Sequence, residues 1–170
     1  MAQHHETVLS VRDMRTEFHG GRGHIRAVDG VSFDVGRGRI VGIVGESGSG
    51  KSMTGYSIMG LIDPPGRVVA GRILLGGRDL LRLDAEAMRA MRGSRVAMIF
   101  QDPMMTLNPV LKIATQMIET VLAHEKVSEA AARARCIAAL EMVGIPSPAE
   151  RLDAYPHQFS GGMRQRVAIA

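Results

Sequence analysis

The segment from Gly45 to Ser52 contains the residue types that bind phosphate groups. It matches the pattern G-x-x-x-x-G-K-[ST], and its residues are Gly45, Glu46, Ser47, Gly48, Ser49, Gly50, Lys51 and Ser52. Glycines let the backbone turn until consecutive N–H groups point inward at an anion. Lys51 brings a positive charge to the β- and γ-phosphates, and the Ser52 hydroxyl can ligate Mg²⁺. The segment therefore predicts a binding site for the phosphates of a nucleotide, and we expect ATP.

The residues on either side of this glycine loop (residues 45–52) predict the elements that position it. Residues 40–44 form a short, continuous apolar run, which is typical of a strand buried on both faces. A helix is predicted over 51–62, and Asp63-Pro64-Pro65 should end it. The start of this helix would add its positive end to the phosphate site. Strand, loop and helix in this order are the context that the motif requires.

Two other interpretations of the loop are disfavoured. A plain Gly/Ser connection does not account for the complete pattern match together with both flanking elements. A GTP-binding protein is disfavoured because Asp63–Gly66, which matches D-x-x-G, follows the loop helix directly with no intervening strand. The chain also contains no Asn-Lys-x-Asp motif for reading a guanine base.

The remaining patterns predict a mixed β and α/β portion followed by a helical portion. Residues 7–18 and 25–35 should form a β-hairpin, with Val31, Phe33 and Val35 on one face and His19–Gly23 as its loop. The other predicted elements are a strand at 68–75, a short helix capped by Asp84, a buried strand at 96–100, and helices at 110–125 and 128–143. Ser128 should be the N-cap of the last helix and Gly144 should end it, and a helical turn should start from Ser147.

Composition excludes several classes of protein. The formal net charge is +4, but the arginines are scattered, which indicates solubility rather than a nucleic-acid surface. No apolar segment of 18 residues occurs and the first residues lack an apolar run, so we expect neither a membrane span nor a secretory signal. The single cysteine, Cys136, permits no internal disulfide and fits a reducing compartment, and we expect it to be core rather than nucleophile.

A second motif lies near the end of the chain. Residues 159–166 read FSGGMRQR, in which Ser160, Gly161 and Gly162 open an Arg-rich helix and so form another anion site at a helix N-terminus. This motif closely resembles the signature of ABC transporter ATPases. The resemblance implies that Ser160, Gly161 and Gly162 contact the γ-phosphate of ATP that is bound to a second ATPase subunit.

Two single residues match further positions of that family. Gln101, at the end of the predicted strand 96–100, resembles the Q-loop glutamine, which would touch Mg²⁺ and the attacking water. Its alternative is a polar strand end before a turn. Phe18 resembles the aromatic residue that stacks on adenine, and its alternative is a hairpin residue packed on the small β portion.

The resemblance covers essentially the whole chain. Residues 27–33, 45–52, 104–110 and 155–166 look like the oligopeptide/dipeptide/nickel branch of ABC importers. This implies an α/β P-loop NTPase fold of the ABC ATPase type, with an antiparallel β subdomain and a helical subdomain. The implied boundaries are 1–101 for the nucleotide-binding core with the β subdomain, 102–159 for the helical subdomain, and 160–170 for the signature and the start of its helix.

The same resemblance implies a function and partners. The complete protein would hydrolyse ATP to energise import of peptides or nickel. It would lie peripherally on the cytoplasmic face of the plasma (inner) membrane, bound to transmembrane permease subunits and to a second ATPase subunit. We expect no nucleic-acid partner. The alternatives left open are a soluble ABC-type ATPase that acts on nucleic acid and a nucleotide-binding fragment without activity.

Some family elements are missing from these 170 residues. No apolar strand ends in Asp-Glu, and no switch histidine follows the signature. We therefore expect part of the core sheet to be missing, the predicted strand 40–44 to form an open sheet edge, and the chain alone to hydrolyse ATP negligibly. We expect no metal site among the N-terminal histidines, because they lack ligand spacing on a defined element; these are His4, His5, His19 and His24.

Overall fold

The computed structural model describes residues 6–20, 23–102 and 106–170. Contacts divide the chain into two compact units, Met1–Ala97 and Met98–Ala170. Each unit contains its own cluster of buried apolar side chains. The domain boundaries taken from the family resemblance stay a prediction.

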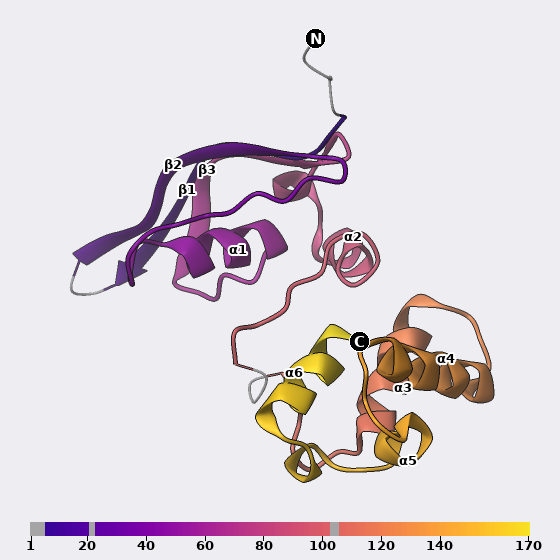
Figure 1. The fold of residues 1–170 in the computed structure, drawn as a ribbon. Helices are drawn as coiled ribbons and strands as arrows, with labels where there is room; N and C mark the ends of the chain where they lie inside the picture. The colour runs from indigo at the N-terminus through magenta and orange to yellow at the C-terminus, as the bar shows by residue number, and fades with distance from the viewer. Residues whose placement is uncertain (1–5, 21–22, 103–105) are drawn as a thin grey trace. The chain divides into compact units, whose positions relative to one another are not determined.

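The first unit is built on an antiparallel sheet (Figure 1). Its strands are β1 (Thr7–Gly20), β2 (Gly23–Gly36), β3 (Gly66–Leu75) and β4 (Arg78–Asp79), in the order β2-β1-β3-β4. The predicted hairpin and the predicted strand at 68–75 are therefore confirmed. Both hairpin strands extend further toward the turn than predicted, since His19 still pairs with His24 and Gly20 with Gly23.

One face of this sheet carries the core of the first unit. Val31, Phe33 and Val35 are half-buried while the residues between them are exposed, as the alternating pattern predicts. The buried members of the cluster come from β1, β2, β3 and the segments after them: Val11, Met14, Val28, Ile73, Leu80, Met88 and Met91.

Short helices complete the first unit. They are α1 (Lys51–Met59), η1 (Leu80–Arg82) and α2 (Ala85–Met91). Asp84 caps α2 as predicted, because its carboxylate accepts a hydrogen bond from the Ala87 N–H at 2.8 Å. Helix α1 ends before the predicted Ile62, since Gly60 adopts a left-handed conformation with φ 62° and its N–H bonds back to the last turn.

Helix α1 lies along the sheet and is joined to it by a buried polar contact (Figure 1). The hydroxyl oxygens of Thr16 on β1 and Ser57 on α1 are 2.6 Å apart, and both residues are buried. The Ser57 hydroxyl donates to the carbonyl of Met53 at 2.6 Å. Since a hydroxyl has one proton, Thr16 must donate to Ser57. This hydrogen bond fixes the position of α1 on β1.

The two predicted buried strands are not strands in the structure. Residues 40–44 have no regular structure, and Ile40 and Val44 are 100% and 95% exposed. Residues 96–100 form only an isolated bridge between Val96 and Arg92. A strand needs a neighbour to satisfy its backbone groups, and no strand of the described sheet pairs with either run. The expected open sheet edge at 40–44 is therefore wrong as well.

The second unit is helical. Its elements are α3 (Ile113–His124), α4 (Glu129–Met142), α5 (Pro148–Leu152), η3 (Pro156–Gln158) and α6 (Gly161–Ile169). Ser128 caps α4, and Gly144, with φ 71°, follows its end, as predicted. Cys136 is 2% exposed in the core of this unit and burial raises the pKa of its thiol, which agrees with a structural role.

We expect Thr16→Val to destabilise the first unit by about 1–2 kcal/mol, because the isosteric side chain leaves the buried Ser57 oxygen without its donor. Thr115→Val, at an exposed position on α3, should change stability by less than about 0.5 kcal/mol. Urea unfolding monitored by circular dichroism measures both. Equal losses in the two variants would show that the Thr16–Ser57 contact contributes nothing.

Candidate nucleotide site

The glycine loop has a backbone shape suited to an anion. Gly48 and Gly50 have φ values of 84° and 88°, whereas Ser49 between them does not have a positive φ. Such alternation turns successive N–H groups toward one point and forms an anion-binding concavity. The Ser49 N–H donates to the Glu46 carbonyl at 3.2 Å, which closes the turn.

The end of the loop is seated on the hairpin. A Cβ atom at Gly50 would lie 2.4 Å from the backbone oxygen of Ala27 on β2. No side chain fits in that space, and the left-handed backbone independently favours glycine. Gly50 is also the N-cap of α1, so the same contact fixes where the helix begins.

Lys51 folds back over the loop. Its Nζ donates to the carbonyl oxygens of Gly45 and Glu46 at 2.8 and 2.6 Å, and it lies 3.3 Å from the Ser49 hydroxyl. A Cβ atom at Gly45 would lie 2.6 Å from that same hydroxyl. The ammonium group therefore lies against the backbone of the loop and does not extend into solvent.

The first turn of α1 adds further donors. The first N–H groups of a helix have no acceptor within the helix. In α1 the Thr54 N–H donates to the Gly50 carbonyl at 2.8 Å. Ser52 lies in this turn and is exposed. The glycine loop, Lys51 and Ser52 are therefore adjacent at the start of α1. Their role at the phosphates of a nucleotide stays a prediction.

Phe18 lies on the same face of β1 as Thr16, because the two are separated by one residue of a strand. Its ring rests against Gly66 of β3, where a Cβ atom would lie 2.4 Å from the ring. Ile62 borders the same space. This contact is the hairpin packing weighed above, and the half-buried ring also keeps an accessible surface. Its role at adenine stays a prediction.

Gln101 belongs to the second unit, where it is exposed in a bend after the irregular segment 96–100. Its role near Mg²⁺ stays a prediction. Residues 103–105 lie outside the described part of the chain. They include the start of the segment 104–110, which resembles the importer branch.

The signature residues open α6 and are accessible. The Ser160 hydroxyl accepts a hydrogen bond from the Met163 N–H at 3.3 Å and so caps the helix. Gly161 and Gly162 are exposed, and a Cβ atom at either would meet nothing within 4 Å. A phosphate group can therefore approach the backbone at this helix start closely.

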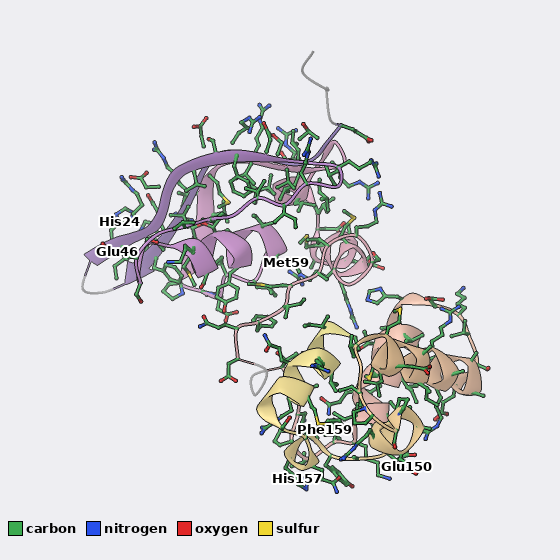
Figure 2. All side chains as sticks on the ribbon, in the orientation of Figure 1. His24, Glu46, Met59, Glu150, His157 and Phe159 are labelled. Carbon is green, nitrogen blue, oxygen red and sulfur yellow. The ribbon has the colours of Figure 1, made fainter. Side chains whose placement is uncertain are left out.

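Buried and charged contacts hold α6 in the second unit. Phe159, just before the motif and labelled in Figure 2, is 3% exposed. The guanidinium of Arg151 lies 5.6 Å from the centre of its ring. Val167 is buried in the same core. Arg166 donates to the carbonyl of Gly144 at 3.2 Å, after the end of α4. These contacts present the Ser-Gly-Gly backbone at the surface.

The comparison with known protein families agrees with this geometry. The family described as "ABC transporter" matches residues 28–170, which include the glycine loop and the signature. The chain belongs to the ABC transporter family. The predicted resemblance is thereby confirmed at the level of the family.

Curated transport ATP-binding proteins resemble this chain along almost its whole length. The dipeptide transport ATP-binding protein DppD of Bacillus subtilis is 52% identical over 97% of the chain and 50% of the relative. The oligopeptide transport ATP-binding protein OppD of the same organism is 48% identical over 96% of the chain and 46% of the relative. DppD of Escherichia coli is 49% identical, over 96% and 50%. The chain therefore spans about half the length of the curated relatives it matches.

Solved structures show the same fold. The dimeric structure of a bacterial ABC transporter cassette has a TM-score of 0.81 and 24% identity, covering 95% of this chain and 67% of the other. The cbiO1 protein of Clostridium perfringens, described as part of an ABC transporter complex, has a TM-score of 0.71 and 25% identity, covering 96% and 60%. The fold is that of an ABC ATPase, as predicted.

The structure also gathers residues to which the sequence assigned no site. Glu17, His19 and His24 lie together at the hairpin end, with the His24 Nε2 atom 2.7 Å and the His19 Nε2 atom 3.5 Å from one Glu17 oxygen. The hydrogen bond from His24 lowers the pKa of the Glu17 carboxyl, and Arg26 lowers it further. The register of β1 against β2, which the histidine spacing along the chain does not reveal, creates this cluster.

We expect Gly50→Ala to destabilise the first unit far more than Gly48→Ala. Both residues have left-handed backbones, which costs alanine about 1–2 kcal/mol. Only Gly50 also faces a backbone oxygen, so its substitution should cost about 2 kcal/mol more because α1 or β2 must shift. Denaturant unfolding of the two variants provides the comparison. If the losses are the same, the close approach to Ala27 does not constrain the loop.

Proposed function

We propose that this chain binds ATP and Mg²⁺ at the glycine loop and is part of the ATP-hydrolysing subunit of an ABC importer for peptides or nickel. The observation that carries the proposal is the glycine loop itself, where Lys51 folds back over the loop and α1 begins directly after Gly50. The similarity to dipeptide and oligopeptide transport ATP-binding proteins supports the transported class.

Different residues would contact different parts of the bound nucleotide and its Mg²⁺. Lys51 and the loop amides would hold the β- and γ-phosphates, and Ser52 would supply a hydroxyl ligand to Mg²⁺, which neutralises charge on the phosphates. Gln101 would contact Mg²⁺ and the attacking water. The exposed start of α6, at Ser160–Gly162, would contact the γ-phosphate held by a second ATPase subunit.

The proposed location is the cytoplasmic face of the plasma (inner) membrane, through transmembrane permease subunits. Within the described residues, no helix has the length and apolar character needed to cross a membrane. Attachment would therefore depend on the permease partners, and the relatives named above are ATP-binding proteins of transport systems.

We expect Lys51→Ala to weaken ATP binding by about 3 kcal/mol, or roughly 100-fold, because the variant lacks the charge-assisted contact to the phosphates. Isothermal titration calorimetry with MgATP measures the affinity. Lys126→Ala, at an exposed position before α4, is the matched control and should bind like the parent chain. Equal affinity in the Lys51→Ala variant and the parent would overturn the phosphate assignment.

Phe18→Ala should weaken ATP binding by about 1–3 kcal/mol if its ring stacks on adenine, whereas Phe18→Tyr should be nearly neutral. Because Phe18 also packs on Gly66, the loss could arise through the fold instead. Inorganic tripolyphosphate separates the two causes, since it has no base. Its affinity should be the same in the parent and in Phe18→Ala. An equal loss for ATP and tripolyphosphate would contradict stacking.

A further inference from the structure

The free end of the hairpin presents a compact group of potential metal ligands. Glu17 and His19 are separated by one residue of β1, so their side chains share a face of the sheet. His24 of β2 pairs directly with His19 and lies on the same face. Figure 2 labels His24 near this end of β2. The nearest ligand atoms of Glu17, His19 and His24 all lie within 4.8 Å of one another.

Both imidazoles face one carboxylate oxygen. The Oε2 atom of Glu17 lies 2.7 Å from His24 Nε2 and 3.5 Å from His19 Nε2. The two rings are close, with centroids 4.8 Å apart and planes inclined by 35°. The Glu17 side chain is only 13% exposed, whereas the histidine side chains are 47% and 43% exposed. The two histidine side chains around this carboxylate are therefore accessible to a cation from solvent.

The other carboxylate oxygen is held by a supporting residue. The Nε atom of Arg26 lies 3.3 Å from Glu17 Oε1, and its Nη1 donates to Asp29 at 3.0 Å. This bridge orients the Glu17 carboxylate and leaves Oε2 directed at the histidines. Asp29 also offsets the positive charge of Arg26, which would otherwise repel a cation.

We propose that Glu17, His19 and His24 form a binding site for a divalent transition-metal cation of the zinc type. Imidazole nitrogens and a carboxylate oxygen are common zinc ligands, at about 2.0–2.2 Å from the metal. In a tetrahedral site such ligand atoms lie about 3.4 Å apart, which small side-chain rotations reach from the observed spacing. Nitrogen ligands disfavour Mg²⁺ and Ca²⁺, and water would complete the coordination.

A metal at this position would tie β1 to β2 at the end of the hairpin. The site is separate from the glycine loop, because Glu17 and His19 point away from the face that carries Thr16 and α1. It is also distinct from the Mg²⁺ position proposed at Ser52. The inference therefore does not depend on nucleotide binding and can be tested in the absence of ATP.

The test is a calorimetric titration of the nucleotide-free chain with Zn²⁺, with Mg²⁺ as a comparison. We expect one Zn²⁺ per chain, an increase in Tm that EDTA reverses, and no comparable effect of Mg²⁺. The double variant His19→Ala/His24→Ala should lose at least about 100-fold in affinity, and Glu17→Gln about tenfold or more. Both histidines are exposed, so the variants should fold like the parent.

The matched control is His4→Ala/His5→Ala, which removes two histidines near the start of the sequence that do not belong to the proposed site. It should bind Zn²⁺ like the parent. Substituted Co²⁺ should give the intense visible absorption of a tetrahedral site in the parent and in this control, but not in His19→Ala/His24→Ala. The proposal is overturned if the parent binds no Zn²⁺, if the His19/His24 variant keeps its affinity, or if the His4/His5 variant loses it.

Discussion

The buried hydrogen bond between Thr16 and Ser57 positions the helix that carries the residues proposed to bind phosphate. It joins β1 to α1 where water cannot replace the contact. Gly50 touches Ala27 of β2 at the opposite end of the same helix. Since one contact lies near each end, α1 can neither slide nor rotate on the sheet without breaking one of them. The helix amides and Lys51 are thereby fixed relative to the hairpin before any ligand is present.

Features encoded within a few residues were predictable from the sequence. The glycine loop, the cap at Ser128 and the hairpin alternation each depend on short-range geometry. The runs at 40–44 and 96–100 are different, because an apolar run indicates a tendency to be buried but does not identify a neighbour. In the described residues neither run has a strand beside it, and Ile40 and Val44 are exposed.

Long-range contacts account for the parts of the sites that sequence reasoning missed. Thr16 and Ser57 are 41 residues apart, and neither belongs to a recognisable motif. Glu17, His19 and His24 become neighbours only through the pairing of β1 with β2, in a register that includes an irregularity just before Glu17. The positions of the histidines along the sequence show no ligand spacing. The short distance between His19 and His24 arises because these residues face each other on paired strands.

The alternation of side chains along β1 places two proposed recognition events on opposite faces of one strand. Phe18 shares a face with Thr16, whereas Glu17 and His19 lie on the other. The pair Phe18–Ile25 sits between the pairs Glu17–Arg26 and His19–His24. A cation held by Glu17, His19 and His24 would therefore fix the backbone that carries the aromatic ring. If the metal orders this end of the hairpin first, less conformational entropy is lost when a base stacks on Phe18. Metal binding would therefore strengthen nucleotide binding although the two ligands do not contact each other.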